Sequence, residues 1–197
     1  PNSEASTVMK WRDIESGKVI RSLETSYIDN FIVSPDGKAI LTDSPDSSVQ
    51  YWDIATQTVR KTLEGHQYNV TALVFVPKTS YVISGSSDTT LKLWDLGSEE
   101  LLATFQGQAE SISRIQLTED RQNLLTIHPQ GSYFQKWEPN TGKVVEVGSL
   151  KEPQLDDLHV TSNSRMAVTL NKQKLLKLWD VDNSEALASL NVDKRLN

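Results

Sequence analysis

Short apolar runs recur along the chain, and turns rich in polar residues separate them. Residues 91–94 alternate between apolar and polar side chains, and this two-residue period is that of a strand with one buried face. The preceding run, residues 81–84, is joined to it by a turn at 86–89, where Ser and Asp favour local hydrogen bonds to the backbone. The pattern predicts an all-β protein built from many short strands.

An acidic residue recurs at a nearly constant spacing, in most copies directly after a tryptophan. The acids at 13, 53, 95, 138 and 180 are separated by 40, 42, 43 and 42 residues. The pairs are Trp52-Asp53, Trp94-Asp95, Trp137-Glu138 and Trp179-Asp180, and an earlier copy reads Lys10-Trp11-Arg12-Asp13. In that copy Arg12 takes the place of the tryptophan. A period of about 40–45 residues with four strands in each repeat is typical of propeller blades.

The expected strand positions repeat in the same order in each copy. First strands are expected around Ile28, Phe31 and Val33; Val70, Leu73 and Phe75; Ile112, Ile115 and Leu117; and Leu155, Leu158 and Val160. Second strands are expected at 39–42, 81–84, 123–126 and 166–169, and each ends in a hydroxyl residue. Third strands carry the tryptophans. Fourth strands end near Leu23, Leu63, Phe105 and Leu190, and the remaining one, 144–147, has the weakest pattern.

The copy from Gly65 to Asp95 holds four polar side chains at set distances, namely His66, Ser84, Asp88 and Trp94. A buried indole N–H needs an acceptor, which the hydroxyl of Ser84 can supply. Asp88 in the following turn could fix the tautomer of His66. A relay of these four groups would join three strands and the incoming loop.

This copy resembles the WD-repeat family of β-propellers in its Gly65-His66 start and its Trp94-Asp95 end. The resemblance implies that His66, Ser84, Asp88 and Trp94 are the family's structural tetrad.

The other copies keep only part of this set. The preceding copy has Thr42, Asp46 and Trp52 but no Gly-His, and the following copy has Gln108 in place of His. The last copy has Lys151 and Gln173 at the His and Asp places.

Counting strands predicts an all-β WD-repeat propeller with four complete four-stranded blades plus a half blade at the N-terminus. The half blade is residues 8–23, and the full blades are 24–64, 65–106, 107–149 and 150–191, between a polar tail at 1–7 and a tail at 192–197. The last copy ends after its own fourth strand, so it does not complete the half blade. We expect an arc of a larger propeller of about seven blades, or completion by missing strands or another chain. Exposed sheet edges should make the isolated chain associate or aggregate.

Composition excludes several classes of function. The net charge of −6 argues against a nucleic-acid or anionic-membrane surface, and the absence of Cys excludes disulfides and thiolate chemistry. No apolar run approaches the roughly 18 residues of a membrane span, and the N-terminus lacks a signal-peptide core. We expect an intracellular protein, cytoplasmic or nuclear, that contacts neither membrane nor nucleic acid.

Enzymatic chemistry is weakly indicated, and we expect no catalytic residue, no metal and no cofactor. His66, Ser84 and Asp88 resemble a nucleophilic triad, but Trp94 and the repeat register assign them to the structural relay. The histidines lack metal-ligand spacing. We expect His128 to be a solvated loop residue and His159 to face the central channel. A propeller hydrolase would need acids or metal ligands there, and the first strands offer Ile32, Val74, Gln116 and His159.

The resemblance implies a non-catalytic scaffold whose faces bind a protein or peptide. An alternative is a regulatory or sensor domain of a larger multidomain signalling protein. The family's recurrent contact positions lead into the first strands and precede the third strands. Here they are Tyr27, Asp29, Pro45, Asn69, Thr71, Ser87, Ser111, Ser113, Pro129, Gln154, Asp156 and Lys172. Tyr27 is the best anchor because aromatic residues dominate interface hot spots, and Asp29 and Asp156 predict a partner segment carrying Lys or Arg.

Replacing Asp88 by alanine should lower the free energy of unfolding by about 1–3 kcal/mol, because His66 and its neighbours would be left partly unsatisfied. The same change at Asp46 should cost less, because no His completes the relay in that copy. Urea unfolding of the two variants measures the difference. Equal losses would contradict the special role of the central copy.

Overall fold

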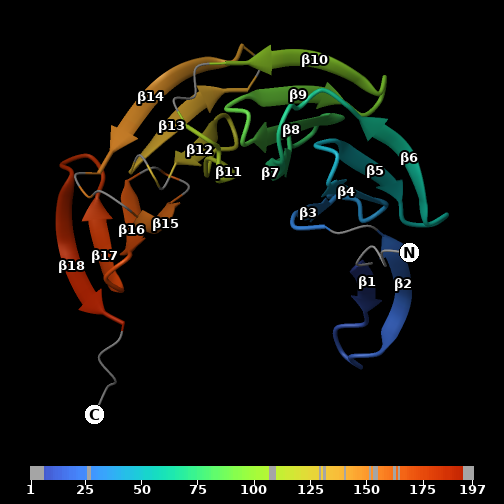
Figure 1. The fold of residues 1–197 in the computed structure, drawn as a ribbon, viewed down its shortest axis with the longest axis horizontal. Coiled ribbons are helices and arrows are strands. Elements are labelled where there is room, and N and C mark those ends of the chain that lie inside the picture. Colours follow the sequence, from blue (N-terminus) through green and yellow to red (C-terminus); the bar gives the residue numbers. More distant parts are fainter. Residues whose placement is uncertain are drawn as a thin grey trace. The chain divides into compact units, whose positions relative to one another are not determined.

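The computed structural model describes residues 7–25, 28–106, 110–128, 130, 132–139, 141–150, 152, 155–161, 163 and 165–192. Strands and turns make up this part of the chain, and no helix occurs in it (Figure 1). The chain divides into two compact units, Pro1–Ser84 with Lys92–Ala103, and Gly85–Leu91 with Thr104–Asn197. Each unit is described by itself.

Consecutive strands of the described residues form one two-stranded sheet and four four-stranded sheets (Figure 1). The two-stranded sheet pairs β1 (Thr7–Arg12) with β2 (Val19–Thr25). The others contain, in order, β3 (Phe31–Val33), β4 (Ala39–Asp43), β5 (Val49–Asp53) and β6 (Thr58–Leu63); β7 (Val70–Phe75), β8 (Tyr81–Ser86), β9 (Leu91–Asp95) and β10 (Glu100–Phe105); β11 (Arg114–Leu117), β12 (Leu124–His128), β13 (Tyr133–Glu138) and β14 (Lys143–Ser149); and β15 (Leu155–Val160), β16 (Met166–Asn171), β17 (Leu175–Asp180) and β18 (Glu185–Asn191).

The second strands β4, β8, β12 and β16 run beyond the hydroxyl residue that was expected to end them. The strand with the weakest pattern, β14, is complete and pairs with β13 over its whole length. Its side chains are mostly exposed, so the backbone pairing, rather than a buried face, holds it in place. Hydropathy therefore carries little information at such an outer strand.

A register shift marks the pairing of third with fourth strands. It lies between Tyr51 and Trp52 in the first four-stranded sheet, and at Lys136/Trp137 and Leu178/Trp179 in the last two. The pairing of β1 with β2 has the same shift between Trp11 and Arg12. By this register β1 and β2 correspond to a third and a fourth strand, and Arg12 takes the tryptophan's place.

Among the described residues, the core of the first unit includes two clusters. One joins the β3–β6 sheet to the β7–β10 sheet through residues such as Leu41, Val49, Leu73 and Trp94. The other is smaller and packs Met9 and Trp11 of β1 against Ile40, Trp52 and Ile54. Sheets thus stack face to face, and burial of both faces supplies the main stabilisation.

The second unit has one larger core between its two sheets. Leu125, Ile127 and Phe134 pack against residues of the β15–β18 sheet, among them Leu158 and Trp179. Gly148 lies against the ring of Phe134, and a Cβ built at this glycine would lie 2.2 Å from ring carbons. Only glycine fits there, because the Phe134 ring is fully buried.

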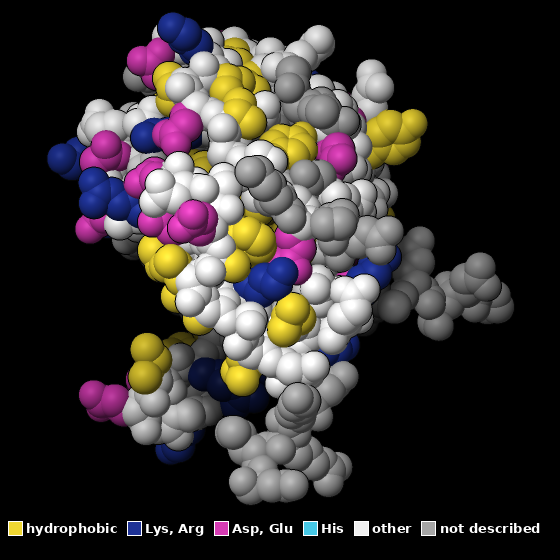
Figure 2. Space-filling view, turned by 90° about the vertical axis from the view of Figure 1, so that its left-hand side faces the viewer, with side chains coloured by type: hydrophobic (Ala, Val, Ile, Leu, Met, Phe, Trp, Pro, Cys, Tyr) yellow, Lys and Arg dark blue, Asp and Glu magenta, His cyan; other side chains and the backbone are white. Residues whose placement is uncertain are grey.

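The surface mixes charge and apolar groups. Figure 2 shows hydrophobic side chains scattered among Lys, Arg, Asp and Glu. Exposed apolar residues of the outer strands include Val145, Val147, Leu187 and Leu190. The described residues contain no helix that is long and apolar enough to cross a membrane.

Candidate functional site

An indole-to-hydroxyl hydrogen bond joins the second and third strands in each four-stranded sheet. The Nε1–Oγ distances are 3.2 Å for Trp52 to Thr42, 2.8 Å for Trp94 to Ser84, 3.0 Å for Trp137 to Thr126 and 2.9 Å for Trp179 to Thr169. These groups are all buried, so a missing acceptor would leave an indole N–H unsatisfied at a cost of about 1–3 kcal/mol. The bond therefore holds one relative position of the two strands.

In the β7–β10 sheet, His66 extends this bond into the segment before β7. Its Nε2 lies 2.8 Å from the Ser84 hydroxyl, which also accepts the Trp94 N–H. Ser84 has no exposed surface, and His66 is 9% exposed. Ser84 consequently cannot reach a substrate as a nucleophile, and the contact fixes the loop that leads into β7.

Asp88 and Asp46 organise equivalent turns. Asp88 Oδ1 accepts hydrogen bonds from the Thr90 amide at 2.9 Å and from its hydroxyl at 2.6 Å. Asp46 Oδ1 accepts the same pair from Ser48, at 3.0 and 2.6 Å, and the Ser48 hydroxyl is the main cause of its lowered pKa. Both alanine variants would lose the hydrogen bonds of the turn. Only the difference between their free energies of unfolding therefore measures the contribution of the relay. That Asp88 completes a tetrad stays a prediction.

His128 is fully buried at the end of β12, so the expectation of a solvated loop residue was wrong. Its Nε2 lies 3.1 Å from the Thr126 hydroxyl that accepts the Trp137 N–H, and its Nδ1 lies 3.2 Å from the Ser111 carbonyl. The ring stacks on Tyr133 at 4.4 Å between centroids. His128 thus contacts the hydroxyl as His66 does, but from within the second strand. Burial lowers its pKa to about 4.

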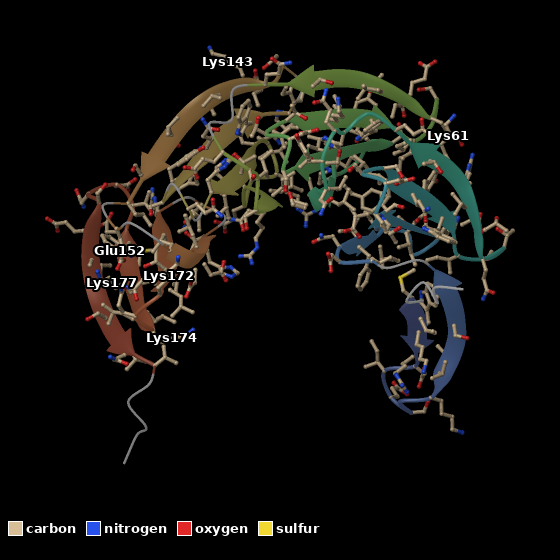
Figure 3. All side chains as sticks on the ribbon, in the orientation of Figure 1. Lys61, Lys143, Glu152, Lys172, Lys174 and Lys177 are labelled. Carbon is tan, nitrogen blue, oxygen red and sulfur yellow. The ribbon has the colours of Figure 1, made fainter. Side chains whose placement is uncertain are left out.

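In the β15–β18 sheet the carboxylate of Glu152 contacts the hydroxyl that accepts the indole N–H. Thr169 accepts the Trp179 N–H and donates to Glu152 Oε2 at 3.1 Å. The other oxygen, Oε1, accepts from Asn171 Nδ2 at 3.0 Å and lies 2.9 Å from Lys177 Nζ. Figure 3 shows Glu152 and Lys177 beside each other. Glu152 is 6% exposed, so its charge is buried and paired.

The sequence register placed Lys151 and Gln173 at the His and Asp places of this last copy. Lys151 lies outside the described residues, and Gln173 is exposed, with its backbone N–H donating to Asn171 Oδ1 at 3.0 Å. Glu152 lies one residue further on and contacts the hydroxyl instead. Because a carboxylate oxygen only accepts, Glu152 accepts the hydrogen bond that the Thr169 hydroxyl donates.

Asp43 holds the segment that leads into β3. Its Oδ1 accepts the amides of Asp29 and Asn30 at 3.0 and 2.9 Å. The Asn30 side chain also donates to the Val70 carbonyl at 3.4 Å, which links the loop to β7. Burial raises the pKa of Asp43, while the Asn30 bonds oppose the rise. These bonds leave the Asp29 side chain exposed on a fixed backbone.

The predicted contact positions are mostly at the surface. Tyr27, Pro129 and Gln154 lie outside the described residues. In the first unit, Asp29, Pro45 and Asn69 are exposed and Thr71 is half-buried; in the second, Ser111, Ser113, Asp156 and Lys172 are exposed and Ser87 is half-buried. Within the second unit, the Ser111 hydroxyl donates to the Ser87 carbonyl at 3.4 Å.

Tyr68 is an exposed aromatic residue that the repeat register did not single out. It lies two residues after His66 and next to Asn69, and it is 63% exposed. The available signal was an aromatic residue in the loop directly after the Gly65-His66 pair. Because His66 fixes this loop, Tyr68 is presented to solvent from a restrained backbone.

The charged cluster on β11 and β15 offers little catalytic chemistry. Arg114 Nη1 lies 2.6 and 2.8 Å from the His159 ring nitrogens, and Asp157 lies 3.3 Å from His159 Nε2. The Gln116 side chain donates to the Val160 carbonyl. No group of three acidic, Cys or His residues that could hold a metal occurs in the described residues.

The comparisons with known proteins agree on the class. Residues 57–95 match the family model described as "WD domain, G-beta repeat". Nuclear distribution protein nudF of Emericella nidulans is 30% identical over 82 residues, which cover 40% of this chain and 18% of that protein. Nuclear distribution proteins PAC1 of Arthroderma benhamiae and Trichophyton verrucosum are each 30% identical over 77 residues, or 37% of this chain and 17% of theirs.

Among solved structures, U3-55K matches with a TM-score of 0.74 and 18% identity, over 93% of this chain and 58% of that one. That likeness concerns the fold alone. The matched segments span less than a fifth of the length of the curated relatives.

The four-stranded sheets and their repeated indole–hydroxyl bond define a repeat protein with an all-β propeller-type fold. The matching repeat at residues 57–95 and the curated relatives support the WD40-repeat family for this chain. The predicted family and fold class are confirmed, and the number of blades in a complete ring stays a prediction. Proteins of this fold are generally protein-interaction scaffolds.

Replacing Glu152 by alanine should lower the free energy of unfolding by about 3 kcal/mol, because it leaves Lys177 and the Thr169 hydroxyl without their buried partner. The matched control is Glu146→Ala, since Glu146 pairs with Lys136 at 3.6 Å but is 43% exposed. The control should cost less than about 1 kcal/mol. Urea unfolding compares them, and equal losses would show that the buried network adds no stability.

His128 should make stability depend on pH. Its folded pKa is about 4, below the ordinary 6.5, so the unfolded chain binds the proton first as pH falls. The contribution of neutral His128 to the free energy of unfolding is fully present above pH 6.5. It is lost as pH falls toward 4, by up to about 1.4 kcal/mol per pH unit. Urea unfolding of His128→Gln should lack this slope. The control variant His159→Gln changes a side chain that is 58% exposed and should keep the pH slope. An unchanged slope in His128→Gln would refute the assignment of the pH dependence to His128.

Proposed function

We propose that the chain is a non-catalytic interaction scaffold that binds a protein or peptide through the loops leading into its first strands and preceding its third strands. The fold supports this role, because rigid sheets present many independent loop side chains. The proposal places the protein inside the cell, in the cytoplasm or nucleus. Each four-stranded sheet, with residues 24–64, 65–106, 107–149 and 150–191 as bounds, is proposed to be one blade.

The observation that carries the proposal is the loop before β7. Its His66 is buried and bonded to Ser84, while Tyr68, two residues on, is exposed. A side chain on a loop that is already fixed loses less conformational entropy on binding. Aromatic residues also dominate interface hot spots. Tyr68 and its neighbour Asn69 are therefore the proposed anchor, in place of Tyr27, which the structure does not describe.

Charge supports a partner segment of mixed sign. Each unit offers its own charged positions: Asp29 of the first unit and Asp156 of the second unit are exposed, and each is proposed to contact Lys or Arg of a partner. Lys172 and Lys174 lie on the turn between β16 and β17 (Figure 3), and both are exposed. An acidic group of the partner would suit this turn. The Asp156→Asn variant should accordingly weaken binding most at low salt, where exposed charges interact most strongly.

A photo-crosslinking residue at position 68 should capture the bound partner, and the same residue at position 101 should not. Leu101 is the control because it is a 41% exposed apolar residue on the outer strand β10. Once a partner is captured, Tyr68→Ala should weaken its binding by about 1–2 kcal/mol, roughly tenfold. Leu101→Ala should leave the affinity unchanged.

The proposal fails if the crosslinks appear only at position 101. It also fails if only substitutions in the turns at Gly17 and Gly142 disturb binding. Those turns join third to fourth strands, away from the loops that lead into the first strands.

A further inference from the structure

A groove of about 630 Å³ lies between the β3–β6 sheet and the β7–β10 sheet of the first unit. The turns that join β3 to β4, β7 to β8 and β9 to β10 line it, together with residues of β5, β6 and β7. Because consecutive strands are antiparallel, these turns lie at the end of the sheet opposite to the loop that leads into its first strand. The groove is therefore separate from the surface of the proposed function.

The floor of the groove is apolar and aromatic. Leu96 is 9% exposed and belongs to the buried cluster that joins the two sheets. Tyr51 and Phe75 pack against this cluster and are half-buried. The floor is thus the open end of a packed core, and its side chains are held in place before a ligand binds. The volume is within the range of about 300–1,000 Å³ that is usual for ligand pockets, so it accommodates a large apolar side chain.

The second unit shows that the fold does not require an aromatic floor. A space of about 480 Å³ there also lies beside a turn that joins first and second strands, and its described lining is polar. The lining residues are Thr118, Glu119, Asp120, Lys136, Asn163 and Arg165. Lys136 corresponds to Tyr51, since each lies two residues before the acid of its repeat. The aromatic ring at position 51 is therefore specific to the groove of the first unit.

The acidic side chains at the groove are held by donors of their own turns. Asp36 Oδ1 accepts the Ser34 hydroxyl at 2.6 Å. Asp53 Oδ1 accepts the backbone amides of Ala55 and Thr56 at 2.8 and 2.9 Å. These carboxylates thus already have hydrogen-bond partners, which lessens what a basic ligand would gain from them.

The lysines at the groove are less engaged. Lys38 and Lys78 are exposed on the turns of the two facing sheets. The Lys78 side chain forms no hydrogen bond or ion pair with any residue that the structure describes. Arg60, in contrast, lies over the Tyr51 ring at 5.6 Å, and its Nε is 3.1 Å from Glu99 Oε1. Carboxylates are therefore the ligand groups that suit the free charge of this groove.

We propose that this groove binds an acidic peptide segment of a partner protein, with one large apolar side chain on the aromatic floor and carboxylates at Lys38 and Lys78. Facing sheets pack about 10 Å apart, and an extended chain rises about 3.3 Å per residue. Carboxylates about three residues apart, on either side of the apolar residue, therefore reach both lysines. Because the groove and the loops of the proposed function are separate surfaces, either proposal can fail without the other.

The probe is the peptide Asp-Glu-Phe-Asp-Glu with acetylated and amidated ends, so that only its side chains are charged. Titration calorimetry with the full chain should show saturable binding. Two control peptides, one with Ala in place of Phe and one with Lys in place of all four acids, should bind more weakly. With benzoylphenylalanine in place of Phe, the acidic probe should crosslink to residues 34–39 or 75–80.

Lys78→Glu should weaken binding of the acidic probe by about tenfold at low salt, because the reversed charge removes an attraction and adds a repulsion. The matched control is Lys143→Glu, which makes the same change at an exposed residue of β14 and should leave the affinity unaltered (Figure 3). Tyr51→Lys, which copies the residue of the second unit, should remove the advantage of Phe over Ala in the probe.

The proposal is overturned by absence of saturable binding, by tighter binding of the basic control peptide, or by crosslinks at residues 66–71 instead. Equal losses in Lys78→Glu and Lys143→Glu also overturn it, because the attraction would then follow net charge alone. Sedimentation that shows self-association abolished by Lys78→Glu overturns it as well, since a second copy would then occupy the groove.

Discussion

The hydrogen bond from a buried indole to a buried hydroxyl is the constraint on which the rest of the structure depends. Trp94 and Ser84 illustrate it at 2.8 Å. Because an indole N–H only donates, the third strand can be buried only where the second strand offers an acceptor. That requirement selects one register for each sheet. The faces of adjacent sheets within each unit can then pack against one another.

The hydroxyl in turn needs a partner, and the chain supplies it from different places. His66 reaches Ser84 from the loop before the sheet, and Glu152 reaches Thr169 in the same way. His128 reaches Thr126 from within the second strand. His66 and Glu152 are themselves part of the segment that leads into the next strand. His128 lies on the second strand and contacts the corresponding segment only through the Ser111 carbonyl.

Fixed loops and open sheet faces expose side chains to solvent for two different reasons. Tyr68 is exposed on a loop in which His66, two residues earlier, is buried. Phe31 is exposed because no described strand covers it, although Leu73 at the corresponding position is buried. A side chain presented from a fixed loop loses little conformational entropy when it is ordered further.

The sequence by itself determined the repeat period, the all-β class and the family, because each depends on residues spaced along one chain. The indole donors and hydroxyl acceptors could also be found, since Trp52, Trp94, Trp137 and Trp179 recur in register. Only the tertiary structure decided which group completes each bond. His128 and Glu152 escaped prediction because they contact the hydroxyl from register positions that differ from that of His66. The exposure of Tyr68 and Phe31 was likewise hidden, because burial depends on which strands pack nearby and not on the residue itself.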